Sequence, residues 1–161
     1  MKKRICQILF FLTVISCSLG VFAADAAIEW RKDYNVAIQE AKEKNLPVFL
    51  LFTNSKSCPF CREIEERIFS RRVFQKFCQN EAIPLKVEFA SLFGTGQKVT
   101  KADIKQVCKN ANIPSSIEMG SWPYVVFISP DGTVLLQSRE NGRTDPDTFV
   151  KKYKKALPKK N

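Results

Sequence analysis

The chain has 161 residues, carries a net charge of +10 and contains no histidine. The lack of histidine excludes Ser–His and Cys–His catalysis, histidine ligation of metals, and haem attachment after a Cys-x-x-Cys pair. Much of the positive charge lies near the C-terminal end, where the lysines between positions 151 and 160 are typical of a solvated helix face, so no nucleic-acid partner is expected.

The first residues have the pattern of a secretory signal peptide, which we place at 1–23 with an approximate cleavage site. A short basic start is followed by an almost wholly apolar stretch at 5–22 and then by small alanines. An uncleaved anchor is one alternative, and lipidation at Cys17 is another, because residues 14–17 resemble a bacterial lipobox. The sequence therefore predicts a periplasmic or otherwise exported protein, with residues 24–161 forming one domain.

The rest of the chain shows apolar residues at helical or strand spacing. Pro47 ends the first helical pattern, and a continuous apolar run follows, typical of a strand buried on both faces. Ser70 and Thr100 are candidate N-caps of later helices, and residues 93–96 form a loop. The predicted elements, in chain order, are helix 33–44, strand 48–52, helix 59–68, helix 71–78, strand 83–89, a helix after Thr100 with Ile104, Val107 and Cys108 facing inward, strand 124–128, turn 130–132, strand 134–136 and helix 145–157.

This order predicts an α/β fold. A buried first strand followed by helical crossovers implies parallel pairing with the second strand, whereas the hairpin around the turn at 130–132 implies an antiparallel edge. We expect a central mixed β-sheet flanked by helices on both faces.

Cys58 and Cys61 form a Cys-x-x-Cys pair at the start of a predicted helix. Unpaired N–H groups and the positive end of the helix dipole stabilise a thiolate on the first sulfur, while the second lies one turn further in and is normally shielded. Cys58 can therefore attack a substrate disulfide, and Cys61 can then attack the mixed disulfide to release reduced substrate. Pro59 presets the backbone for the helix start and has no N–H to leave unsatisfied.

Two other uses of this pair are zinc binding and a purely structural disulfide. A structural zinc site needs four ligands, and only Cys78 and Cys108 could complete it, although they form no second Cys-x-x-Cys. A purely structural disulfide would stabilise little, because the loop that it closes is so short. We favour a redox pair that needs no metal and no bound cofactor. Cys78 and Cys108 are expected to be buried free thiols, with a second disulfide as the alternative.

The apolar strand, the polar loop, the segment Cys58-Pro59-Phe60-Cys61 and the charged helix together resemble the active-site region of the thioredoxin superfamily. Residues 121–127 resemble that family's cis-proline loop as it enters its third strand, and the turn at 130–132 falls where the family has a hairpin. The resemblance covers essentially the whole chain after Trp30. It extends to the small periplasmic thioredoxin-like thiol–disulfide oxidoreductases, including the DsbH type.

The resemblance implies a role for each matching residue. It makes Cys58 and Cys61 the catalytic pair and the bond between Trp122 and Pro123 a cis peptide packed against their disulfide. Together with Pro59 and Phe60, this second loop would form the active-site surface that meets an extended substrate. An ordinary proline at a strand edge is the alternative for Pro123.

Two positions depart from the family pattern. Thioredoxins usually carry a buried acid in the strand before the cysteines, where this chain has the apolar Leu51 and Phe52. Lys86 and Glu88 on the next predicted strand are candidate substitutes, although ordinary surface charges are the simpler interpretation. Ser57 replaces the tryptophan that usually precedes the first cysteine. Both changes leave the rate and direction of proton transfer open.

The direction of electron flow is expected to be reducing, because Pro59 and Phe60 supply neither a charge nor a side-chain donor, and Lys56 and Arg62 are expected to point to solvent. The expected substrates are exported protein thiols or disulfides, handled by a monomer. An exported reductant would also need a membrane electron-transfer partner. The alternatives are a dithiol oxidase that introduces disulfides and a non-catalytic thioredoxin-like binding module for an exported client.

Overall fold

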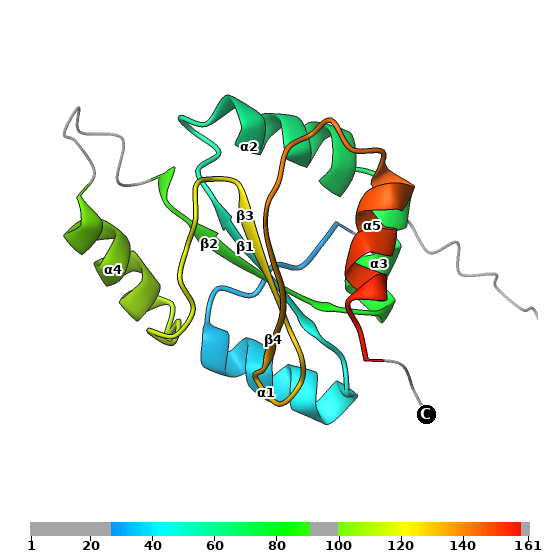
Figure 1. Cartoon of the computed structure of the whole chain (residues 1–161), viewed down its shortest axis with the longest axis horizontal. Helices are drawn as coiled ribbons and strands as arrows, with labels where there is room; N and C mark the ends of the chain where they lie inside the picture. The colour runs from blue at the N-terminus through cyan, green and yellow to red at the C-terminus, as the bar shows by residue number, and fades with distance from the viewer. Residues whose placement is uncertain (1–26, 91–99, 159–161) are drawn as a thin grey trace, which may run out of the picture.

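The computed structural model describes residues 27–90 and 100–158, so the expected signal peptide and the expected loop at 93–96 lie outside the described residues. The elements are α1 (Tyr34–Lys44), β1 (Val48–Thr53), α2 (Pro59–Ile64), the π-helix η1 (Glu65–Phe69), α3 (Arg72–Asn80), β2 (Ile83–Glu88), α4 (Lys101–Asn110), β3 (Tyr124–Ile128), β4 (Val134–Arg139) and α5 (Pro146–Lys155). Each of them corresponds to a predicted helix or strand, and Figure 1 shows their arrangement.

The helices begin where side chains can satisfy their first N–H groups. The Asp33 carboxylate accepts the N–H of Val36 before α1, and Asp145 caps α5, in which Pro146 is the first residue. Thr100 and Asp103 form a reciprocal capping box at α4, which confirms the predicted cap. These caps fix the ends of the helices that flank the sheet.

Two predicted details were wrong. Ser70 does not cap α3: Arg71 is the N-cap residue, without a side-chain bond, and the Ser70 hydroxyl donates to the carbonyl of Glu66. The reason is that η1 ends in a wide π-turn, closed by the N–H of Ser70 on the carbonyl of Glu65, which keeps Ser70 in the preceding helix. Strand β4 is also longer than predicted, because pairing with β3 continues as far as Arg139.

The described strands form one mixed sheet in the order β2-β1-β3-β4. Strand β1 lies in the middle, parallel to β2 and antiparallel to β3, and β3 and β4 form the antiparallel hairpin. All six residues of β1 are buried, as expected for a strand covered on both faces. The mixed sheet expected from the sequence is confirmed.

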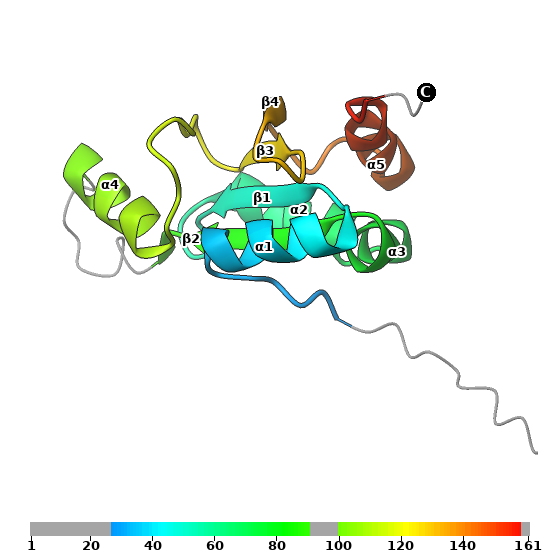
Figure 2. The ribbon, with the colours of Figure 1, turned by 90° about the horizontal axis from the view of Figure 1, so that it is seen from below.

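Each face of the sheet packs against its own set of helices. Alternate residues of β1 and β3 point to opposite faces, and they divide the core into two clusters. Val48, Leu50 and Phe52 join the cluster that contains buried residues of α1, with α4 packed at its margin. Phe49 and Leu51 join the aromatic cluster under α2, η1, α3 and α5. Figure 2 shows α1 lying across the sheet, with α4 on one side and α3 and α5 on the other.

Helix α4 covers the sheet less completely than predicted. Ile104, Val107 and Cys108 pack against the first cluster but stay half-buried, and no residue of α4 is fully buried. Among residues 27–90 and 100–158, no helix is long and apolar enough to cross a membrane.

Candidate functional site

Cys58 lies between the polar loop after β1 and the first turn of α2. Its backbone is extended, with φ −103° and ψ 110°, so it is the N-cap of the helix, and its sulfur accepts the N–H of Cys61 at 3.2 Å. Pro59 takes the first helical position, where no N–H is needed. The Cys58 side chain is partly exposed, and the neighbouring Phe60 is 40% exposed. A substrate can therefore reach the first sulfur.

Cys61, one turn further along α2, is completely buried. Burial raises the pKa of its thiol to about 12, and the neighbouring Cys58 side chain adds to the rise. The backbone N–H of Asn54, whose nitrogen is 3.5 Å from the Cys61 sulfur, acts in the opposite direction. The two sulfurs thus differ in access. The Cys58 sulfur is open to solvent, whereas the buried Cys61 sulfur can react only at Cys58.

Thr53, the last residue of β1, interacts with this buried sulfur through its side chain. It is fully buried, and strand alternation puts it on the same face as Phe49 and Leu51, the face that α2 covers. Its Oγ1 is the one buried side-chain nitrogen or oxygen without a hydrogen-bond partner in the described part of the chain. The same hydroxyl lowers the pKa of the Cys61 thiol. This combination indicates that Thr53 favours the thiolate of Cys61 over its thiol.

The loop before β3 packs against Cys58. The peptide bond between Trp122 and Pro123 is cis, and the carbonyl oxygen of Trp122 is 4.0 Å from the Cys58 sulfur, at the long limit of an S–H···O contact. The Trp122 ring lies 5.3 Å from that of Phe89 between centroids, and its Nε1 donates to the sulfur of Met119 at 3.1 Å. The structure thus brings together Cys58, Cys61, Pro59, Phe60, Trp122 and Pro123 from segments more than sixty positions apart.

Lys86 and Glu88 do not take the place of the missing buried acid. The Glu88 carboxylate accepts the N–H and the hydroxyl of Ser55, at 3.0 and 3.1 Å, and the N–H of Ala90 at 3.2 Å. Lys86 pairs with Glu65 at 3.5 Å and lies over the Trp30 ring. Glu88 therefore holds the loop that carries Cys58, a role that the sequence analysis missed because the two segments are distant in the chain.

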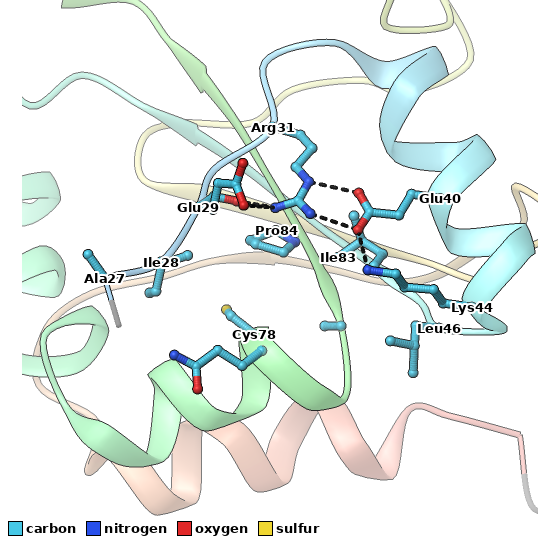
Figure 3. A pocket seen from close by; sticks show the side chains of 12 residues that line it. Ala27, Ile28, Glu29, Arg31, Glu40, Lys44, Leu46, Cys78, Ile83 and Pro84 are labelled. Atoms are coloured by element: carbon cyan, nitrogen blue, oxygen red, sulfur yellow. Dashed lines mark hydrogen bonds and ion pairs between the residues drawn. The ribbon is translucent and has the colours of Figure 1, made fainter. Parts of the chain in front are cut away.

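The other two described cysteines lie outside the site, and all four are free thiols. Cys78 belongs to the cluster under α3 and α5, whereas Cys108 packs at the margin of the cluster on the opposite face of the sheet, so they do not meet. Cys78 lines a pocket of about 320 Å³ beside the ion-paired Arg31, Glu40 and Lys44 (Figure 3). Burial raises the pKa of both the Cys78 and the Cys108 thiol, which disfavours their reactive thiolates.

No group of three or more Cys, Asp or Glu side chains that could hold a metal ion is found within residues 27–90 and 100–158. What the site offers is therefore a pair of sulfurs. The outer one lies at a helix N-terminus, where N–H groups favour a negative charge. The inner one interacts with it directly. Such an arrangement is suited to thiol–disulfide exchange through a mixed disulfide.

Comparison with known proteins agrees with this geometry. The family model of the thioredoxin-like domain matches residues 34–157. The disulfide bond reductase DsbH of Chlamydia pneumoniae is 26% identical over 112 residues, which cover 70% of this chain but 63% of that relative. The match thus spans less than two thirds of the relative's length.

Solved structures show the same fold. The structure of a DsbH oxidoreductase superposes with a TM-score of 0.63 at 21% identity, covering 82% of this chain and 85% of that one. A thioredoxin from Thermus thermophilus gives a TM-score of 0.54 at 15% identity and covers 81% of this chain and 87% of its own.

Proposed function

Because the chain belongs to the thioredoxin-like domain family, we propose that it is a thiol–disulfide oxidoreductase whose catalytic pair is Cys58 and Cys61. The observation that carries the proposal is the difference between the two sulfurs: Cys58 is partly exposed and accepts an N–H at the start of α2, while Cys61 is buried directly behind it. The similarity to a disulfide bond reductase supports the same reaction class.

The reaction has two exchange steps. The Cys58 thiolate attacks one sulfur of a substrate disulfide, so that a bond forms between Cys58 and the substrate while the substrate disulfide breaks. The electron pair leaves with the other substrate sulfur, which takes up a proton. Cys61 then loses its proton and attacks the Cys58 sulfur. This closes the Cys58–Cys61 disulfide and releases the second substrate thiolate, so the substrate gains two electrons and the protein loses two.

We place this activity in the reducing direction and outside the cytoplasm. The dipeptide Pro59-Phe60 supplies no charged group or side-chain donor to stabilise the Cys58 thiolate further. The signal-peptide pattern at 1–23 supports export, to the periplasm or beyond. The substrates would then be exported protein disulfides, reduced by a monomer without a bound cofactor. A membrane electron-transfer partner would restore the dithiol. The loop at Trp122 and Pro123 would offer its backbone to the extended substrate.

Turnover is tested by the reduction of insulin with dithiothreitol as electron donor. We expect catalysis by the protein and its loss in Cys58→Ser, while Cys108→Ala, which changes a half-buried thiol outside the site, keeps it. Absence of catalysis by the unaltered protein would contradict the proposal and favour a binding module.

The direction is tested by the reduction potential of the Cys58–Cys61 couple, measured with Cys78 and Cys108 replaced by alanine. Thioredoxin-like reductants have potentials near roughly −270 mV and strong oxidants near roughly −120 mV. A value near the first supports reduction of exported substrates. A value near the second would make the protein a dithiol oxidase.

A further inference from the structure

A hollow of about 290 Å³ opens beside the catalytic pair. It is lined by Phe60, which stands between the two cysteines in sequence, by Arg139 at the end of β4, and by Glu140, Asn141 and Arg143, which follow it. Phe60 gives the hollow an apolar wall, and the residues after β4 give it a polar one. Through Phe60 the hollow lies next to the segment that carries Cys58 and Cys61.

The segment that follows β4 is held firmly against both halves of the site. The N–H of Glu140 donates to the carbonyl oxygen of Pro123 at 2.9 Å. Gly142 packs so closely on α2 that a Cβ there would lie 2.8 Å from the backbone carbon of Glu63. The N–H of Arg143 donates to the side chain of Asn141 at 3.0 Å. The backbone that carries the two arginines is therefore fixed relative to Phe60.

The acidic groups next to this hollow already have cationic partners. Glu140 is buried and accepts bonds from Lys152, at 2.5 Å, and from the hydroxyl of Tyr153. Glu63 pairs with Arg67 at 3.0 Å. Neither Arg139 nor Arg143 makes an ion pair within residues 27–90 and 100–158, and both are exposed. Their positive charges are thus left uncompensated at the rim of the hollow.

The charge on the other side of Cys58 has the same sign. Lys56 and Arg62 make no ion pair with another described residue, and Arg62 donates only to the backbone carbonyl of Lys56, at 3.4 Å. Glu88 is the acidic group on this side, and its carboxylate is turned to Ser55 and Ala90. Lys56 and Arg62 thus add two positive charges without ion-pair partners close to Cys58 in the sequence.

We propose that this hollow, with Arg139 and Arg143 on its rim, binds an acidic segment next to the reactive disulfide of the substrate protein. The inference rests on the proposed function and adds the substrate class. Guanidinium groups match the fork of a carboxylate, and the Phe60 ring can cover the apolar stem of the same side chain. Because both arginines are exposed, their charges act mainly on the rate of association, and this effect weakens as the salt concentration rises.

The experiment compares two model peptides that contain the same disulfide, flanked by glutamates in one and by lysines in the other. We expect the protein to reduce the glutamate peptide roughly three- to tenfold faster in kcat/KM at low salt, with a smaller ratio at high salt. In Arg139→Glu/Arg143→Glu the ratio should invert or approach one. The matched control is Lys151→Glu/Lys155→Glu, which makes the same charge change at exposed positions of α5 and should keep the original ratio.

The outcomes separate the two proposals. Bis(2-hydroxyethyl) disulfide is neutral and small, so its reduction by the unaltered protein tests the exchange chemistry alone. If that disulfide is not reduced, the proposed function fails and this inference fails with it. If it is reduced but both peptides react equally, only the acidic-substrate inference is overturned. An equal loss of the ratio in the control pair would also overturn it, since the preference would then come from net charge and not from the hollow.

Discussion

The Thr53 side chain at the end of β1 interacts with the Cys61 thiol of α2, and both residues are completely buried. The Thr53 hydroxyl has no hydrogen-bond partner while Cys61 is a thiol, yet it lowers the pKa of that thiol. A donor that is unpaired before the reaction and paired once the sulfur is charged stabilises the reacting state selectively. In the proposed reaction Thr53 would therefore assist the second exchange step, from a position next to Leu51 and Phe52, where the family usually has a buried acid.

Replacement of Thr53 with valine should slow resolution without unfolding the protein. Valine has nearly the same shape, so we expect the second exchange step to slow roughly three- to tenfold, because the Cys61 thiolate loses a donor. The free energy of unfolding should stay the same or rise by about 1 kcal/mol, because a buried unpaired hydroxyl is removed. Single-turnover reaction with dithiobis(nitrobenzoate) releases one coloured thiolate on attack by Cys58 and a second on resolution, and so measures both steps.

Thr53→Ser is the matched control for this substitution. It keeps the hydroxyl and should resolve at close to the original rate, with a small loss of stability from the missing methyl group. A merely structural role for Thr53 would give the opposite pattern, with valine neutral in rate and serine the more damaging change.

The pH dependence of resolution follows from the burial of Cys61. Burial raises the pKa of its thiol to about 12 in the dithiol form, where Cys58 adds to the rise. The Cys58 contribution is lost in the mixed disulfide, but burial, the largest cause, remains, so the thiolate is a minor species at neutral pH and grows about tenfold with each pH unit while the pH stays well below the pKa. The second thiolate release should therefore accelerate about tenfold per unit between roughly pH 7 and 9. A rate that levels off within this range would show that the thiol ionises much more easily than its burial indicates.

Loss of the Glu88 carboxylate should loosen the loop that carries Cys58. Glu88→Ala leaves the N–H and hydroxyl of Ser55 and the N–H of Ala90 without their acceptor, which we expect to cost about 2 kcal/mol in unfolding free energy and to slow the first thiolate release. The comparison is Glu81→Ala, which breaks an exposed ion pair with Lys154 and should cost well under about 1 kcal/mol. Equal urea midpoints for the two variants would contradict the bracing role of Glu88.

Local pattern was enough to predict much of the fold and the centre of the site. The apolar run of β1 and the Cys-x-x-Cys pair are contiguous signals, and the cap at Thr100 is a local one. Thr53 was missed although strand alternation alone puts it on the α2 face, because the expected strand was ended one residue early. Its role could not be predicted from the sequence, because the sequence does not show which helix covers that face.

Other parts of the site depend on contacts that no local pattern carries. Glu88 meets Ser55 from 33 residues away, and Arg139 comes beside Phe60 only because β4 runs on past its predicted end. Ser70 is a good N-cap residue, but the π-turn at the end of η1 includes it in the preceding helix. Its local preference is therefore overridden by the structure of that helix.

The ion pair between Arg31 and Glu40 should make stability depend on pH. The Arg31 guanidinium donates to both Glu40 oxygens, at 2.8 and 2.7 Å, and holds the pKa of this carboxyl below its ordinary value. In Figure 3 dashed lines join the two side chains on one side of the pocket, with Lys44 as a second partner of Glu40. Since the pKa is lower in the folded chain, the pair contributes stability above the ordinary carboxyl pKa and loses it as pH falls through the folded value.

Glu40→Gln should therefore lower the free energy of unfolding by about 1 kcal/mol at pH 7, where the native carboxylate is charged. The difference should shrink as the pH falls below about 4, because the Glu40 side chain of the unaltered protein becomes neutral as well. Urea midpoints measured along the pH series test this, with Glu43→Gln as the control, since Glu43 is exposed and, among the described residues, bonds only to Gln39. A difference that stays constant with pH would mean that shape, and not charge, makes Glu40 stabilising.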